Sequence, residues 1–226
     1  MMQLRVKSAM FLEPSQQQWT ELSPLPEFVY SHSVAVLNGY LFVAGGSNHD
    51  VHHPVNQQIS RRVHRYDTRS AKWVMSKPML EKRAFFTLSA LGDKLYAVGG
   101  LNHSSPVYDR ISIEEIAESN IKPQTILASP TAECYDPKSD KWELVEKLSE
   151  PSMLHSSIVH DGKLYMSGGC SSFDLQKVEG DVAVLMTVMN SDFCREFSDS
   201  LSCYDPNIGV WEKREPMTTK RAGHKM

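Results

Sequence analysis

The sequence predicts an all-β fold: a partial β-propeller of about three four-stranded blades, with incomplete blades on either side. Segments 31–46, 85–100 and 154–169 can be laid over one another, and each ends in a pair of glycines. Downstream of each pair, a Tyr-Asp dipeptide is followed by a tryptophan at constant spacing. Four short antiparallel strands per unit, repeated at about 50 residues or more, are typical of propeller blades.

Each unit begins with a predicted hairpin. In the first unit, residues 32–37 and 40–44 form its strands around Asn38-Gly39, a turn pair that is favoured because both residues need positive φ. Asp161-Gly162 fills this turn in the third unit and Gly92-Asp93 fills it in the second. The Tyr-Asp and tryptophan segments supply the third and fourth strands, joined by turns rich in Asp, Pro, Asn and Gly.

The units differ mainly in the connection between their second and third strands, as expected for loops on a rigid scaffold. Three insertions lie there, at about 47–61, 101–131 and 170–200, of which the second and third are the longest. The predicted organisation is a blade tail or disordered start at 1–18, repeats at 19–73, 74–142 and 143–211, and the start of a further repeat at 212–226.

Residues that recur in register are expected to be structural. Paired glycines let a strand end approach a neighbouring backbone where a Cβ would collide. Tyrosine and tryptophan at fixed positions pack as large apolar bodies between blades, with their polar ends satisfied. These residues are Gly45, Gly46, Gly99, Gly100, Gly168, Gly169, Tyr66, Tyr135, Tyr204, Trp73, Trp142 and Trp211.

Together these motifs resemble the kelch repeats of the kelch-like (BTB-BACK-kelch) family of ubiquitin-ligase adaptors, over about residues 12–226, truncated to part of the propeller. The family's arginine near the start of the first strand is met by Arg83 and Arg221, whereas Val29 and Ser152 stand there in the other units. The resemblance implies a BTB domain and a BACK region outside this sequence, so that cullin would be reached only through the BTB domain.

We expect a binding module, not an enzyme, because the sequence has no nucleophile elbow, P-loop or dinucleotide fingerprint. No catalytic residue, cofactor or metal site is predicted. The resemblance implies substrate recognition for a cullin-RING ubiquitin ligase; the alternative is a cytoskeletal or scaffolding kelch protein without ligase function. Kelch enzymes such as galactose oxidase need a copper site of tyrosine, histidine and cysteine that nothing here marks.

The long connections should lie on one rim, because in a blade the second-to-third-strand connection shares a face with the link to the next blade. Their acidic residues form the candidate partner face: Asp109, Glu114, Glu115, Asp174, Glu179, Asp181 and Asp192. Such a rim favours a protein partner with a basic segment. The apolar run 182–186 in the third connection is a partner anchor, an extra strand, or sequence outside the repeat.

A net charge of −3 gives no reason to expect nucleic acid or a membrane as partner. We expect a cytoplasmic protein, with cytoskeletal association or a nuclear location as alternatives. The histidines at 49, 52 and 53 are weak metal candidates. His32, His155 and His224 share one repeat position with Phe86 and should fill it for packing. Cys134 and Cys203 should be buried, and Cys170 is the one candidate for a reactive thiol.

Overall fold

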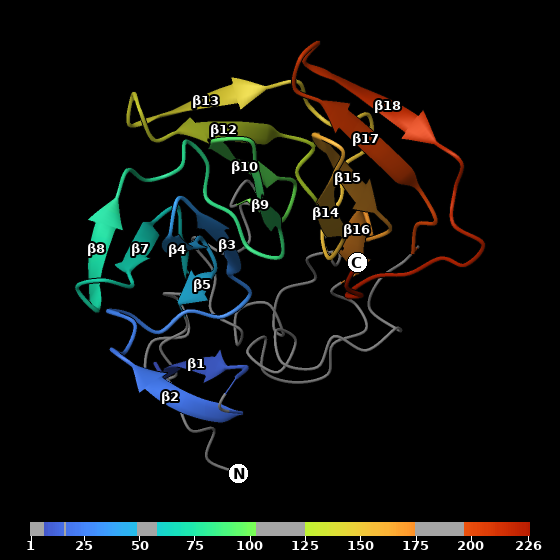
Figure 1. Ribbon diagram of the computed structural model, residues 1–226. Helices are drawn as coiled ribbons and strands as arrows, with labels where there is room; N and C mark the ends of the chain where they lie inside the picture. Colours follow the sequence, from blue (N-terminus) through green and yellow to red (C-terminus); the bar gives the residue numbers. More distant parts are fainter. Residues whose placement is uncertain (1–6, 16, 49–57, 103–124, 175–196) are drawn as a thin grey trace.

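The computed structural model describes residues 7–15, 17–48, 58–102, 125–174 and 197–226. Three four-stranded antiparallel sheets dominate the described chain, each a simple meander, and they are arranged as neighbouring blades in an arc (Figure 1). The predicted all-β partial propeller is confirmed. In blade order the strands are β3 (Ser33–Leu37), β4 (Tyr40–Ala44), β7 (Val63–Asp67) and β8 (Lys72–Ser76); β9 (Thr87–Leu91), β10 (Lys94–Val98), β12 (Ala132–Asp136) and β13 (Lys141–Val145); and β14 (Ser156–His160), β15 (Lys163–Ser167), β17 (Leu201–Asp205) and β18 (Val210–Arg214).

In the described part of the chain, three further strand pairs lie outside the blades. Near the N-terminus, β1 (Ala9–Glu13) pairs with β2 (Gln18–Leu22) and sets Leu12 opposite Trp19, the register in which Tyr66 faces Trp73. β5 (Ser47–Asn48) pairs with β6 (Gln58–Ile59), and β11 (Thr125–Leu127) pairs with β16 (Ser172–Asp174). No helix among the described residues is long and apolar enough to cross a membrane.

The hairpin turns have the backbone geometry that their sequences require. Asn38 and Gly39 have φ of 51° and 78°, and Asp161 and Gly162 have φ of 47° and 69°. In the second blade Gly92 alone takes a positive φ, 62°, which fits its place as the first central residue. Because these two-residue turns fix the pairing register, the inward and outward faces of every blade follow from them.

The apolar core lies between consecutive blades. One cluster joins blade 1 to blade 2 through Phe42, Leu95 and Tyr135, and a second joins blade 2 to blade 3 through Tyr96, Leu164 and Tyr204. Ring contacts cross both seams: Phe42 lies 6.3 Å from Tyr135, and Tyr96 lies 5.7 Å from Tyr204, measured between centroids. Blade 2 therefore buries one face against blade 1 and the other against blade 3.

The recurring tyrosines and tryptophans lie where each blade meets the strands that precede it. Each tyrosine sits opposite its tryptophan, with ring centroids 5.0 Å apart in blade 1, 5.2 Å in blade 2 and 5.1 Å in blade 3. Each indole Nε1 donates to the backbone oxygen just after β2, β8 or β13, the strand that precedes its own blade; the three acceptors are Ser23, Lys77 and Glu146, at 2.7, 3.0 and 2.9 Å. The ring thus packs in one blade while its polar end is satisfied by another.

The paired glycines lie where each blade meets the chain that enters the next. A Cβ on Gly45, Gly99 or Gly168 would lie 2.4, 2.4 or 2.3 Å from the carbonyl oxygen at the start of the following repeat. All three have a φ of 62°. Both the space and the backbone conformation therefore require glycine here. The second members, Gly46, Gly100 and Gly169, have the same crowding, with backbone oxygens at 2.8, 2.6 and 2.6 Å.

A run of backbone hydrogen bonds links the blades at one repeated position. Phe85 N donates to Ser31 O (3.0 Å), Leu154 N to Phe85 O (2.9 Å), and Gly223 N to Leu154 O (2.7 Å). All four residues have positive φ, between 55° and 67°. This conformation turns each peptide toward the neighbouring blade, so one residue accepts from the following blade and donates to the preceding one.

Candidate functional site

The two long connections meet on one rim of the arc. β11 belongs to the connection 101–131 and β16 to the connection 170–200, and the two strands pair antiparallel from Thr125–Asp174 to Leu127–Ser172. This places the described ends of both insertions side by side, on the side of the blades where β5 also lies (Figure 1). Strand pairing between insertions of different blades joins them through their backbones, in addition to their separate attachment to the scaffold.

An apolar layer supports this rim. Leu101 and Cys170 follow the glycine pairs, Ala84 and Met153 lie in the links between blades, and bridges join Ala84 to Leu101 and Met153 to Cys170. With Ile59 and Ala128 these residues form a third buried cluster, against which Phe85, Leu154 and Phe197 pack. The long connections therefore begin and end beside a buried apolar cluster that contains residues of all three blades.

Most of the predicted acidic partner face lies outside the described residues. This holds for Asp109, Glu114, Glu115, Glu179, Asp181 and Asp192, and for the apolar run 182–186. Asp174 ends β16, within the pairing of the two insertions, although its side chain is not described. The acidic rim thus stays a prediction.

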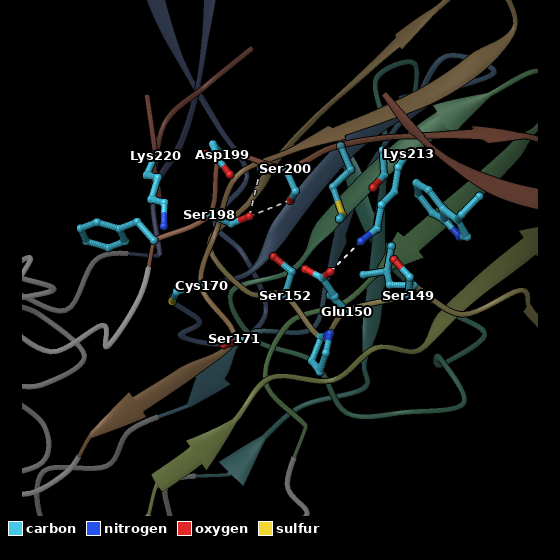
Figure 2. A pocket seen from close by; sticks show the side chains of 16 residues that line it. Ser149, Glu150, Ser152, Cys170, Ser171, Ser198, Asp199, Ser200, Lys213 and Lys220 are labelled. Atoms are coloured by element: carbon cyan, nitrogen blue, oxygen red, sulfur yellow. Dashed lines mark hydrogen bonds and ion pairs between the residues drawn. The ribbon is translucent and has the colours of Figure 1, made fainter. Parts of the chain in front are cut away.

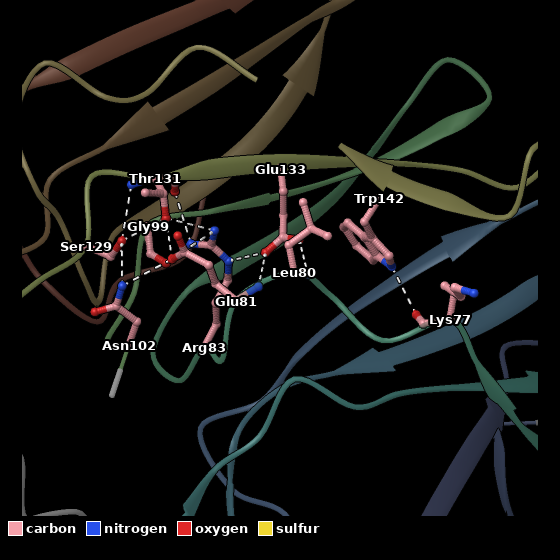
Figure 3. A network of polar contacts seen from close by, with 10 residues as sticks. All are labelled: Lys77, Leu80, Glu81, Arg83, Gly99, Asn102, Ser129, Thr131, Glu133 and Trp142. Carbon is pink, nitrogen blue, oxygen red and sulfur yellow. Dashed lines mark hydrogen bonds and ion pairs between the residues drawn. The ribbon is translucent and has the colours of Figure 1, made fainter. Parts of the chain in front are cut away.

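Blade 2 contains a buried ion pair that motif spacing did not reveal. Arg83 and Glu133 are both fully buried, with Arg83 Nε 2.8 Å from Glu133 Oε1. Arg83 Nη1 also donates to Gly99 O (2.7 Å) and Thr131 O (3.0 Å), and Nη2 donates to Thr131 Oγ1 (2.9 Å) (Figure 3). Glu133 accepts in addition from Leu80 N at 2.6 Å. Arg83, which lies in the link between blades 1 and 2, therefore binds through its guanidinium to the end of β10 and the start of β12.

Blade 1 replaces this pair with another polar cluster. Val29 stands at the arginine position and His64 at the glutamate position. His64 Nε2 lies 2.8 Å from Glu27 Oε1, and Arg62 Nη1 donates to Glu27 Oε2 at 2.6 Å. Burial acts to raise the pKa of Glu27, but the hydrogen bonds from His64 and Arg62 hold it below its usual value. Arg62, which directly precedes β7, thus supplies a cation in place of the missing arginine.

Blade 3 has serines at both positions, Ser152 and Ser202, and a cavity of about 180 Å³ there (Figure 2). Ser152 Oγ donates to Gly168 O at 3.2 Å. Arg221, the other arginine that matches the family position, contributes through its backbone: its oxygen accepts from Gly169 N (2.7 Å) and its nitrogen donates to Ser198 O (3.0 Å). Its side chain is exposed.

The shared histidine position packs against the glycine pairs. The ring carbon Cε1 of His155 lies 2.8 Å from where a Cβ on Gly99 would be, and His224 and Phe86 lie similarly near Gly168 and Gly45. His155 Nε2 is 3.1 Å from Thr87 Oγ1. Burial lowers the pKa of His155 to about 4. Among the described residues, no group of three or more His, Cys, Asp or Glu side chains is placed to hold a metal ion.

His155→Phe is expected to flatten the pH dependence of stability. In the unfolded chain a histidine has a pKa near 6.5, whereas burial lowers the pKa of His155 in the folded chain to about 4. The stability that the neutral His155 contributes is therefore fully present above about pH 6.5 and is lost as the pH falls toward 4. The wild type should lose about 2 kcal/mol from this group between about pH 7.5 and about pH 5. Phe86 fills the same position in blade 2, so phenylalanine fits.

Urea unfolding at the two pH values measures this effect. His160→Phe is the control: His160 ends β14, the strand that directly follows His155, and its side chain is 71% exposed. An equal loss of stability on acidification in wild type and His155→Phe would contradict the assignment.

The cysteines behave as small core residues where they are described. Cys134 and Cys203 are buried on β12 and β17, and Cys170 is 2% exposed, bridged on one side to Met153 and on the other to Phe197. Burial raises the pKa of Cys134. The structure gives Cys170 a packing role beneath the rim.

Four-stranded blades with glycine pairs at their seams, and with tyrosine and tryptophan in register, define the kelch type of propeller. Two families, each described as Kelch motif, match residues 29–80 and 151–218. The chain belongs to the kelch-repeat family.

Several relatives match almost the whole chain. Kelch-like protein 36 of Bos taurus is 30% identical over 217 residues, 96% of this chain and 28% of that protein. Kelch-like protein 34 of Homo sapiens is 31% identical, over 92% of this chain and 28% of that protein. The chain thus spans little more than a quarter of the length of these relatives. Among solved structures, YjhT matches with a TM-score of 0.65 at 14% identity, over 95% of this chain and 60% of that one, which supports the fold alone.

Proposed function

We propose that the chain is a protein-interaction module and serves as part of the substrate-recognition propeller of a cullin-RING ubiquitin ligase adaptor. The observation that carries the proposal is the pairing of β11 with β16, which gathers two long connections on one rim. Variable connections on a rigid scaffold are where binding residues concentrate. The likeness to kelch-like proteins across 96% of the chain supports the adaptor role.

The partner in this proposal is a cytoplasmic protein with a basic segment. The connection 170–200 has a net charge of −4 and the connection 101–131 a net charge of −2, counted from their Asp, Glu, Lys and Arg residues. Opposite charge speeds encounter and fixes orientation more than it adds affinity. Cullin would bind to a BTB domain, not to the repeats.

Leu127→Lys is expected to weaken capture of such a partner roughly fivefold to tenfold, because it replaces an exposed apolar contact with a positive charge that repels the basic segment, and loss of a central contact commonly costs more than about 1 kcal/mol. Leu127 lies on β11 at the rim and is 66% exposed. The matched control is Ile208→Lys. Ile208 is 63% exposed but lies in the turn from β17 to β18, at the opposite end of the strands from the long connections.

Quantitative affinity purification with the 226-residue chain and the two variants measures the effect. Proteins depleted by Leu127→Lys but retained by Ile208→Lys are rim partners. If the two variants deplete the same proteins equally, the rim is not the binding face. Cullin activation is then blocked in cells: a ligase substrate accumulates, whereas a partner of a scaffolding kelch protein keeps its level.

A further inference from the structure

The cavity in blade 3 occupies the place of the arginine network of blade 2. The two repeats match residue for residue with an offset of 69 in number, as their tryptophans do. Four side chains of the blade 2 network, Arg83, Asn102, Thr131 and Glu133, correspond to Ser152, Ser171, Ser200 and Ser202. All four serines line the cavity, and Ser152, Ser171 and Ser200 are labelled in Figure 2. Its volume of about 180 Å³ is far more than a single water needs.

The backbone acceptors that bind the guanidinium in blade 2 are kept in blade 3. Gly99 N donates to Thr131 O at 2.9 Å, and Gly168 N donates to Ser200 O at 2.9 Å, so the strand ends superpose in their hydrogen bonding. In blade 2 the oxygens of Gly99 and Thr131 accept in addition from Arg83 Nη1. A carbonyl oxygen has two acceptor sites. In blade 3, Ser152 stands in place of Arg83. Of the two corresponding acceptors, Gly168 O and Ser200 O, its hydroxyl reaches only Gly168 O.

A negative charge is also present at the cavity, although the buried glutamate is not. Asp199 lines it where blade 2 has Pro130, and Glu150 lines it at the position of Glu81. Glu150 is bound to Lys213 at 2.7 Å, but both side chains are 64% exposed, and such a surface pair is weak enough to exchange. Lys220 also lines the cavity, so the described lining contains two carboxylates and two ammonium groups.

We propose that this cavity binds the guanidinium of an arginine side chain supplied by a protein partner, in the way that blade 2 binds its own Arg83. Ser200 O and the hydroxyls of Ser200 and Ser202 accept from the planar donor group, and Asp199 balances its charge. Lysine is a poorer fit, since a single ammonium does not reproduce the fork of donors that contacts two carbonyls and a hydroxyl at once. The source of the arginine, a protein partner, rests on the proposed function. The ability of the cavity to bind a guanidinium does not rest on it.

Titration of the 226-residue chain with Nα-acetyl-arginine amide tests the cavity without any partner. The expected result is saturable binding, at least about tenfold weaker for the lysine and citrulline amides, which lack the donor fork or the charge. Ser152→Arg combined with Ser202→Glu rebuilds the blade 2 pair and should abolish binding. Ser139→Arg combined with Thr68→Glu places the same charges on exposed turns and should leave binding unchanged.

A second measurement holds even if the filled variant does not fold. Met166 lines the cavity and is 4% exposed, whereas Met79 is buried at the seam of blades 1 and 2. In a chain labelled at the methionine methyl groups, the arginine amide should shift the Met166 signal and leave that of Met79 in place.

Three results would overturn the proposal: equal binding of the lysine and arginine amides, binding of phosphate in preference to arginine, or no saturable change at Met166. The last result would mean that the cavity holds water alone. If the arginine amide binds as expected but purification finds no rim partner, the cavity assignment stands and the proposed function fails. The reverse result leaves the proposed function in place.

Discussion

Glu133→Ala is expected to lower the free energy of unfolding by about 3–5 kcal/mol, because it leaves a buried arginine without its counter-charge. Arg83 and Glu133 are both fully buried, so the guanidinium would be left in an environment without water. The substitution also removes the acceptor of Leu80 N. Urea unfolding followed by tryptophan fluorescence measures the loss, since Trp142 lies at the same seam.

The control for this prediction is the double variant Arg83→Ser with Glu133→Ser, which copies Ser152 and Ser202 of blade 3. It removes both charges together, so it should lose less stability than the single substitution even though it opens a cavity. A double variant less stable than Glu133→Ala would show that packing, and not the uncompensated charge, dominates at this position.

Gly99→Ala is expected to cost roughly 2–5 kcal/mol, combining a strained positive φ with overpacking. The added Cβ would lie 2.4 Å from Ser152 O and 2.8 Å from a ring carbon of His155, so the link into blade 3 must shift. The same unfolding measurement applies.

Gly92→Ala separates the two contributions. Gly92 has the same φ of 62° but no heavy atom within 4 Å of the added Cβ. It should cost about 1–2 kcal/mol from backbone strain alone. Equal losses of unfolding free energy in the two variants would mean that the contact between blades 2 and 3 accommodates the extra methyl group at no energetic cost.

Much of this fold could be predicted from the sequence because its signals are local and repeated. Asn38-Gly39 and Asp161-Gly162 dictate their turns by their own conformational preferences, and three copies of one pattern specify three copies of one sheet. The pairing of β11 with β16 could not be predicted, because short strands within long connections of different blades show no alternation that identifies a partner.

The polar networks were also beyond motif reasoning. Val29 and Ser152 looked like losses of one arginine, but the position two residues before the recurring tyrosine changes with them: Glu133 faces Arg83, His64 accompanies Val29, and Ser202 accompanies Ser152. That joint variation between repeats was the available signal. It becomes meaningful only when the structure shows that these positions, far apart in sequence, lie together beneath the link between blades.

The hydrogen bonds from Phe85 N to Ser31 O, from Leu154 N to Phe85 O and from Gly223 N to Leu154 O share a direction: the acceptor always belongs to the earlier blade. The tryptophan indoles follow the same rule. During translation, which delivers the chain from its N-terminus, each blade that has left the ribosome already offers the carbonyl groups that its successor needs. For these bonds the order of synthesis is also the order in which donors meet their acceptors, whereas Gly46 N, Gly100 N and Gly169 N donate in the opposite direction, to carbonyl groups of the following repeat.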